Sequence, residues 1–253
     1  MLSLRNLELS FGGIEALRRI SFDAAPGQIT GVIGPNGAGK TSLFNTISGL
    51  YRPDSGQVLL DGADITRLRP DRRAMLGVAR TFQNIALFRG MSVLDNIRLG
   101  GHTRLRSGVL DALLWFGRAR SEELALRARI EAQVIDFLEL DHVRKVPVDA
   151  LPYGLQKRVE LGRALAMRPR LLMLDEPVAG MNREETGDMA RFILEAQAEY
   201  GITILLVEHD MHLVMDLCAQ VVVLNFGRQI ANGPPGAVRT DPAVIEAYLG
   251  VAA

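Results

Sequence analysis

The sequence has 253 residues, balanced charge with 29 Lys and Arg against 29 Asp and Glu, and a single cysteine, Cys218. One cysteine excludes a disulfide framework and a cysteine-rich zinc site, and we expect Cys218 to be inert core. Charge neutrality disfavours a nucleic-acid partner, and no apolar stretch approaches the ~18 residues of a membrane span. Because the amino terminus also lacks a signal-peptide core, we expect a soluble, cytoplasmic chain.

The amino-terminal part predicts mostly strands. Apolar stretches on either side of Gly12-Gly13 indicate an antiparallel hairpin, and the turn at Asp61-Gly62 indicates another. One continuous apolar strand runs directly into a glycine-rich loop, and a helix follows that loop. The strands are expected at 2–9, 14–22, 28–33, 56–60 and 78–82, and the helix at 41–50.

Residues 92–168 lose the strand signals and predict mostly helix. Their one-sided apolar stripe consists of Leu124, Ala128, Ala132, Ile135 and Leu138. We expect Trp115 and Phe116 to pack in the core of this helical part, and the alternative is that they form a patch on which a partner docks. Beyond it, strands are expected at 171–174, 202–207, 221–224 and 229–231, and helices at 183–200 and near 242–249. The alternation of strands and helices predicts an α/β fold whose sheet core is interrupted by a helical insertion.

Residues 34–41 match the pattern G-x-x-x-x-G-K-[ST] between a predicted strand and a predicted helix. Glycines in such a loop let backbone N–H groups surround phosphates, and the helix N-terminus adds positive potential. Lys40 is expected to reach the β- and γ-phosphates and the Thr41 hydroxyl to ligate Mg²⁺. A chance glycine-rich turn is the alternative. The residues expected to contact phosphate are Gly34, Pro35, Asn36, Gly37, Ala38, Gly39, Lys40, Thr41 and Ser42.

Two adjacent acids, Asp175 and Glu176, end the predicted strand 171–174. Asp175 is expected to hold Mg²⁺ through water, and Glu176 to act as the general base on the attacking water. The alternative is that two acids merely end a strand. The phosphate loop and the two acids are together compatible with several families of nucleotide-binding proteins. GTPases are disfavoured because no Asn-Lys-x-Asp segment follows, and a small-molecule kinase lacks a recognisable acceptor site and lid.

Further segments, in this order, resemble those of the ATP-binding cassette (ABC) ATPases over essentially the full length. Thr81-Phe82-Gln83-Asn84 resembles their Q-loop, Leu151-Pro152-Tyr153-Gly154-Leu155-Gln156 their signature segment, and Val207-Glu208-His209-Asp210 their switch-histidine strand. The resemblance implies a RecA-like P-loop NTPase core with an antiparallel β subdomain and an inserted helical subdomain. It implies a single cassette over 1–253, with the core at 1–91 and 169–253 and the helical subdomain at about 92–168.

The resemblance also implies roles for single residues. Phe11 would stack on adenine, and Gln83 would join the metal and water site while sensing the membrane subunit. His209 would bond the γ-phosphate, and Gly154 would face the nucleotide of the opposite subunit. Without the resemblance, each of these residues has a simpler structural explanation. Phe11 would be a core aromatic, Gln83 an ordinary polar residue and His209 a histidine at a strand end.

Three segments resemble the ATP-binding subunits of branched-chain amino acid importers: 78–97, the Val-Glu-His-Asp-Met around His209, and the tail 241–250. This implies ATP and Mg²⁺ as cofactors, permease subunits, a second ATP-binding subunit in a homo- or heterodimer, and indirectly a solute-binding protein. The chain would lie on the cytoplasmic face of the membrane. Importers of urea, amides and aromatic acids, the ATPase of an exporter or lipid extractor, and a soluble non-transport ABC protein remain alternatives.

One departure concerns the signature segment. Pro152 stands where the family usually has a serine that contacts the γ-phosphate across the dimer, and Leu155 where glutamine is usual. Proline donates no hydrogen bond but suits the first turn of a helix, so the Gly154 amide could still face phosphate. We therefore expect a weakened cross-subunit site and an asymmetric pair with a second ATPase. Asn182, where aspartate is common, suggests altered communication between the two sites.

Overall fold

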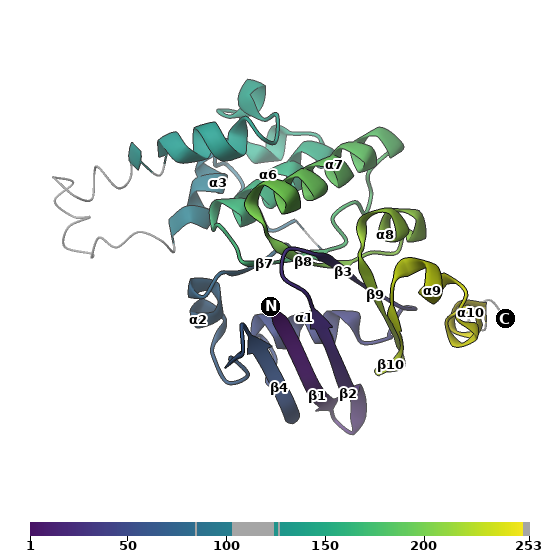
Figure 1. The fold of residues 1–253 in the computed structure, drawn as a ribbon. Coiled ribbons are helices and arrows are strands. Elements are labelled where there is room, and N and C mark those ends of the chain that lie inside the picture. Colours follow the sequence, from purple (N-terminus) through teal and green to yellow (C-terminus); the bar gives the residue numbers. More distant parts are fainter. Residues whose placement is uncertain (84, 103–123, 126, 250–253) are drawn as a thin grey trace. The chain divides into compact units, whose positions relative to one another are not determined.

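The computed structural model describes residues 1–83, 85–102, 124–125 and 127–249 (Figure 1). The chain forms two compact units. The first comprises Met1–Arg80, Arg170–Pro177 and the chain from Ile193 onward, and the second the described parts of Thr81–Pro169 and Val178–Phe192. The second unit thus begins before residue 92, the expected start of the helical subdomain, and includes a segment after residue 168. Trp115 and Phe116 lie outside the described residues.

The first unit contains a four-stranded antiparallel sheet in the order β2-β1-β4-β5. Its strands are β1 (Leu2–Phe11), β2 (Ile14–Ala24), β4 (Ser55–Leu60) and β5 (Ala63–Asp64). Both predicted hairpins are present, since β1 pairs with β2 and β4 with β5. Gly12 and Gly13 make the first turn with φ of 53° and 87°, a region that glycine enters without steric cost. Figure 1 shows β1, β2 and β4 side by side.

A second sheet of the first unit has six strands in the order β10-β9-β3-β8-β7-β6. All but β10 run parallel, and β10 pairs with β9 in the antiparallel sense. Every residue of β3, β7 and β8 is buried, which explains their continuous apolar sequences. The strands are β3 (Ile29–Ile33), β6 (Val78–Arg80), β7 (Leu171–Asp175), β8 (Thr203–Val207), β9 (Gln220–Asn225) and β10 (Arg228–Gly233).

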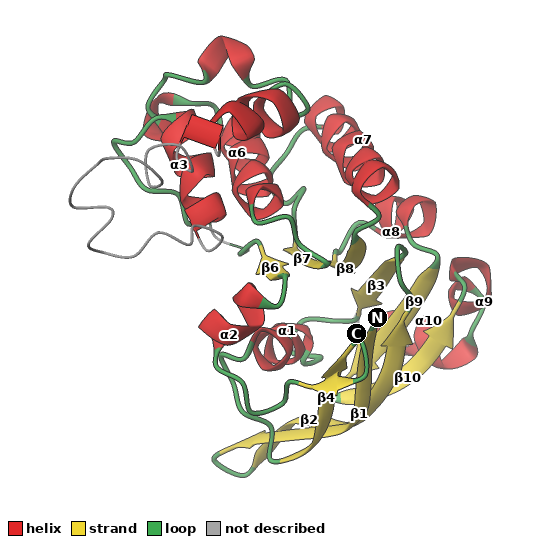
Figure 2. Ribbon diagram, turned by 60° about the vertical axis from the view of Figure 1, so that its left-hand side comes forward, coloured by secondary structure: helices red, strands yellow, loops and turns green. Residues whose placement is uncertain are grey.

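One hydrophobic core joins the two sheets of the first unit, since Leu4 and Ile20 of the antiparallel sheet share a cluster with Val32 and Met173. The helices of this unit are α1 (Lys40–Ser48), α2 (Pro70–Met75), α8 (Met211–Leu217), α9 (Pro235–Arg239) and α10 (Pro242–Leu249). Figure 2 shows α9 and α10 beside β10. Cys218 is buried as expected, and burial raises the pKa of its thiol to about 12, which leaves it inert.

The described part of the second unit is mostly helical, as predicted. Its elements are α3 (Val93–Gly101), a π-helical turn η2 (Glu131–Ile135), the 3₁₀ turns η3 (Asp141–Val143) and η4 (Val148–Ala150), α6 (Tyr153–Ala166) and the start of α7 (Arg183–Tyr200). Helix α7 continues into the first unit from residue 193.

The predicted apolar stripe of the helical part is only half right. Leu124, Ala128 and Ala132 are exposed, whereas Ile135 and Leu138 are buried. The buried face is completed by Ile130 and Val134. The π-helical turn η2 shifts the phase of the helix, and alanine carries too little apolar area to define the buried face.

Candidate nucleotide site

The ends of three buried parallel strands bring the expected site residues of the first unit to one edge of the six-stranded sheet. The phosphate loop follows β3, Asp175 ends β7 with Glu176 directly after it, and His209 follows β8. Strand β8 lies between β3 and β7, and all three run in the same direction. Their carboxyl ends therefore meet, which is where open parallel sheets bind ligands.

Two glycines of the phosphate loop are required by close backbone approaches. Gly34 has φ of 151°, and a Cβ there would collide with the Leu224 carbonyl oxygen. Gly39 has φ of 105°, and its Cβ would lie 2.6 Å from the Ala16 carbonyl oxygen. Helix α1 begins directly after Gly39 and has no side-chain cap, so its amino-terminal N–H groups are left to a ligand. The loop can accept an anion through its backbone.

Lys40 is held inside the loop. Its Nζ donates to the carbonyl oxygens of Gly34 at 2.6 Å and Pro35 at 3.1 Å. Burial lowers the pKa of the Lys40 ammonium, and the negative charges of Glu176 and Asp175 partly oppose that shift. The ammonium therefore lies within the electrostatic reach of both acids.

Glu176 and His209 are in direct contact. The Glu176 Oε1 lies 2.9 Å from the His209 Nε2, and the Glu176 side chain is 15% exposed against 46% for His209. The backbone N–H of Glu176 donates to Val207 at 2.9 Å, so it extends the pairing of β7 with β8. Glu176 has φ of 51°, an unusual conformation for a residue with a Cβ, and such strain is found at functional sites.

Asp175 has a partner that the sequence did not predict. Its Oδ2 lies 2.8 Å from Arg80, and both side chains are nearly buried. Arg80 ends β6, which pairs with β7, so the sheet order creates this ion pair. An arginine at a strand end carries no signal of its own in the sequence, because the pairing of β6 with β7 spans more than ninety residues of chain.

Phe11 is 45% exposed, so it is not the core aromatic of the alternative interpretation. Its ring meets that of Tyr51 edge-on, with centroids 5.1 Å apart and an interplanar angle of 70°. Tyr51 was not predicted as a site residue; its aromatic type three residues after the end of α1 is the only sequence signal for it.

Gln83 and Gly154 belong to the second unit. The backbone carbonyl of Gln83 accepts a hydrogen bond from Lys157 Nζ at 3.2 Å, while its neighbour Asn84 lies outside the described residues. Pro152 is the N-cap of α6, with φ of −54°, and places Gly154 in the first turn. The structure thus confirms that Pro152 fits the start of a helix.

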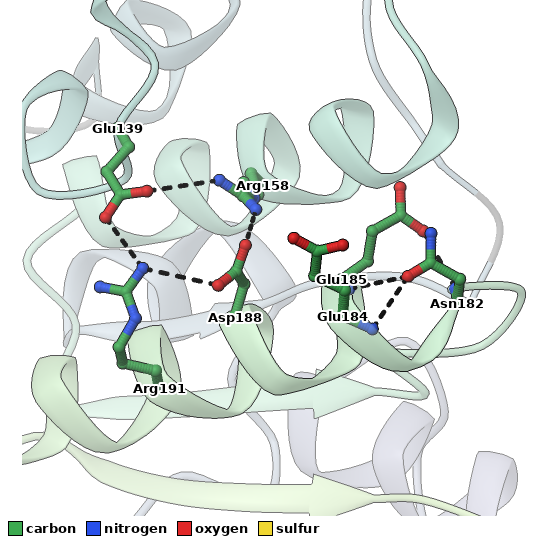
Figure 3. A network of polar contacts seen from close by, with 7 residues as sticks. All are labelled: Glu139, Arg158, Asn182, Glu184, Glu185, Asp188 and Arg191. Carbon is green, nitrogen blue, oxygen red and sulfur yellow. Dashed lines mark hydrogen bonds and ion pairs between the residues drawn. The ribbon is translucent and has the colours of Figure 1, made fainter.

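Asn182 begins α7 with a reciprocal cap (Figure 3). Its Oδ1 accepts from the backbone N–H groups of Glu184 at 2.9 Å and Glu185 at 3.0 Å, and Glu185 Oε2 accepts from the Asn182 N–H at 3.0 Å. This is a capping box. The Glu185 carboxyl also lies directly against the Cα of Gly154, so a Cβ at Gly154 would collide with it.

The residues present fit a magnesium ion. Mg²⁺ in nucleotide sites uses one or two protein ligands and completes its shell with phosphate and water. Thr41 at the start of α1 is exposed and offers a hydroxyl, and Asp175 offers a carboxylate. Within the described part of the chain no group of three or more His, Cys, Asp or Glu side chains is placed to hold a metal.

A protein-family model described as "ABC transporter" matches residues 17–179 of the sequence. The chain belongs to this family. Its residues 228–253 also match a model described as "Branched-chain amino acid ATP-binding cassette transporter". The ABC subunit is thus an ATPase that couples ATP hydrolysis to transport, with the P-loop NTPase core and antiparallel β subdomain of the family.

Relatives of the ABC subunit extend over its whole length. The high-affinity branched-chain amino acid transport ATP-binding protein LivG of Escherichia coli strain K12 is 41% identical over 100% of this chain and 98% of its own. BraF of Pseudomonas aeruginosa, which carries the same description, is 39% identical over 100% of this chain and 98% of its own. The solved ADP conformation of an ATP-binding cassette is 33% identical, with a TM-score of 0.85 over 99% of this chain and 98% of that chain.

None of the helices in the described part of the chain combines the length and the apolar character that a membrane span requires.

Proposed function

We propose that this ABC subunit drives an importer of branched-chain or other hydrophobic amino acids. The observation that carries the proposal is the carboxyl-terminal match at 228–253, because it sets this chain apart from ABC ATPases in general. The end-to-end similarity to LivG and BraF, which are described as branched-chain amino acid transport proteins, supports it. Importers of urea, amides or aromatic acids are the closest alternatives, since another subunit would bind the solute.

The proposed partners are transmembrane permease subunits, a second ATP-binding subunit and, indirectly, a solute-binding protein. The chain would form one cassette, with the helical subdomain proposed at about 92–168, and two cassettes would enclose two ATP molecules. Docking on permease subunits would hold it at the cytoplasmic face of the membrane.

Co-purification tests the solute assignment. A tagged copy of the subunit, isolated from its source cells with the permease and solute-binding protein, would be followed by a thermal-shift screen of that binding protein. We expect leucine, isoleucine or valine to stabilise it, whereas urea, short amides and aromatic acids would not. Stabilisation by one of the latter solutes alone would overturn the amino-acid assignment.

In the proposed reaction, the loop of residues 34–42 binds the phosphates of ATP through backbone N–H groups, and Phe11 stacks on adenine. Lys40, whose ammonium now bonds two loop carbonyls, would turn to the β- and γ-phosphates. Glu176 would accept the proton of the attacking water. His209, which already contacts the Glu176 carboxylate, would bond the γ-phosphate.

Mg²⁺ would be held by the Thr41 hydroxyl and, through water, by Asp175, with Gln83 as a further ligand. When bound, it would neutralise charge that develops on the phosphates. Gly154 would face the nucleotide of the second subunit. These assignments rest on the shared sheet edge for the first unit and on the motif for Gln83 and Gly154.

Replacing Lys40 tests the phosphate site directly. Lys40→Ala should lose ATP binding in an equilibrium assay, because it removes the ammonium that would meet the phosphates. Lys145→Ala is the matched control, since Lys145 is an exposed lysine of the second unit. ATP affinity within twofold of the unmodified chain in Lys40→Ala would contradict the proposed site.

A further inference from the structure

Arg80 makes contacts that the proposed reaction does not yet use. Its side chain is 7% exposed. One guanidinium nitrogen, Nη2, donates to Asp175 Oδ2 at 2.8 Å, and the other, Nη1, donates to Asn45 Oδ1 at 2.6 Å and Ser48 Oγ at 3.2 Å. The guanidinium also lies 5.5 Å from the centre of the Phe44 ring. One buried cation thus joins the end of β7 to helix α1.

The acceptors on α1 lie on a particular face of that helix. Thr41, Asn45 and Ser48 are separated by four and three residues, so they share one face. Thr41 is the proposed metal ligand at the start of this face, and Asn45 follows it by one turn. Arg80 therefore contacts the same face of α1 that carries Thr41, and it directly contacts Asp175, which would hold the ion through water.

We propose that Arg80 is a positioning residue for the magnesium site: it fixes the Asp175 carboxylate relative to helix α1 and so sets where that carboxylate lies relative to the Thr41 hydroxyl. The proposal rests on the proposed roles of Thr41 and Asp175. Mg²⁺ demands near-ideal octahedral geometry, so a small displacement of one ligand lowers its affinity. Residues that orient metal ligands typically contribute 10–100-fold to metal affinity.

The chemistry of arginine fits this role. Its planar guanidinium presents donors in a fixed fork, so it can hold a carboxylate with one nitrogen and two other acceptors with the second. Lysine would supply the charge as a single point without the fork. The pair is buried, and a buried carboxylate that loses its partner is strongly destabilised.

The test compares nucleotide affinity in EDTA and in rising Mg²⁺, measured on the purified full-length chain with a fluorescent ATP analogue. In the unmodified chain, Mg²⁺ should tighten binding. In Arg80→Met, affinity in EDTA should stay within threefold, whereas the Mg²⁺ concentration for the half-maximal gain should rise about tenfold or more. Arg80→Lys should recover part of that shift. Asn45→Ala, which removes only one acceptor, should show a smaller shift and serves if Arg80→Met does not fold.

Arg73→Met is the matched control. Arg73 is also a buried arginine that donates to the end of α1, at 2.7 Å to the Thr46 and Ile47 carbonyl oxygens, and it contacts no proposed ligand. Its loss should lower the melting temperature and leave the Mg²⁺ midpoint unchanged. An unchanged or lower midpoint in Arg80→Met, or an equal shift in Arg73→Met, would overturn the inference. Absence of any Mg²⁺ effect in the unmodified chain would instead refute the proposed metal site.

Discussion

Among the contacts between individual side chains, the one between Glu176 and His209 bears most directly on the proposed chemistry. The Oε1 to Nε2 distance of 2.9 Å joins residues from the ends of two neighbouring strands. A general base held by a second polar group is oriented before substrate arrives. The acid could be predicted from its place after a strand, but the contact depends on the order of strands in the sheet, which the sequence does not specify locally.

The contact predicts that Glu176 and His209 act as a unit. His209→Ala should keep ATP binding and lower turnover about 100-fold or more. The double variant with Glu176→Gln should have a turnover only slightly below that of Glu176→Gln alone, because the effects of substituting residues that act together are not additive. His212→Ala, an exposed histidine three residues along, is the control. Multiplicative losses in the double variant, measured by steady-state ATPase assay, would contradict the coupling.

Phe11 carries a second prediction at this scale. Stacking of a base on an aromatic ring contributes roughly 1–3 kcal/mol, so Phe11→Ala should weaken ATP binding by about fivefold or more. Phe11→Trp should retain it. Phe88→Ala is a control because Phe88 is another exposed phenylalanine, 55% exposed, in the second unit. If isothermal titration gives equal affinity for ATP before and after Phe11→Ala, the adenine role is wrong.

At the scale of elements, helix α6 holds the segment that contains Gln83. Glu160 Oε1 accepts from the Phe82 N–H at 3.3 Å, and Lys157 Nζ donates to the Gln83 carbonyl at 3.2 Å. Four charges also link α6, α7 and the turn after η2: Arg158 and Arg191 each contact Glu139 and Asp188 (Figure 3). The signature segment and the Gln83 segment are therefore joined through one helix.

Glu160 predicts a pH effect on stability. Burial raises the pKa of its carboxyl above 4.5, with Lys157, the Phe82 N–H and Arg163 opposing. Between the ordinary and the raised value, the unfolded chain has released a proton that the native chain retains, so stability falls as pH rises. Glu160→Gln should remove this fall in urea unfolding, whereas Glu246→Gln, at an exposed site, should not. The same slope in both variants would contradict the burial argument.

The cap of α7 predicts an effect on stability that does not depend on pH. Asn182→Ala removes the acceptor of two N–H groups and should lower the free energy of unfolding by about 1 kcal/mol. Asn182→Asp, which keeps an acceptor, should leave it nearly unchanged. Urea unfolding of both variants measures this, and equal stability of Asn182→Ala and the unmodified chain would show that the cap is not formed in solution.

At the scale of the whole molecule, motif order was enough to predict the family and the class of fold. The positions of most strands followed from their apolar sequence, because buried parallel strands are apolar throughout. Long-range pairings were not accessible: the contact of Arg80 with Asp175 and that of Phe11 with Tyr51 depend on tertiary packing. In the helical part, the predicted burial of Leu124 and Ala128 was wrong, because the phase of the helix shifts and alanine contributes little apolar area.

Pro152 matters for the assembled transporter, in which the signature segment would meet the opposite nucleotide. Restoring the hydroxyl with Pro152→Ser should raise ATPase turnover, since a hydrogen bond to a charged group contributes roughly 1.5 to 3 kcal/mol. Pro234→Ser is the matched control, because Pro234 is also the N-cap of a helix, α9. Unchanged turnover in the Pro152 variant would remove the argument for a weakened site and an asymmetric pair.

The most direct test of the account is single-turnover phosphate release by Glu176→Gln, measured together with ATP affinity and oligomeric state. If Glu176 is the general base, Glu176→Gln should bind ATP like the unmodified chain, arrest phosphate release and accumulate a closed dimer, because the base is lost while the phosphate loop is intact. Phosphate release at the normal rate in Glu176→Gln would contradict it.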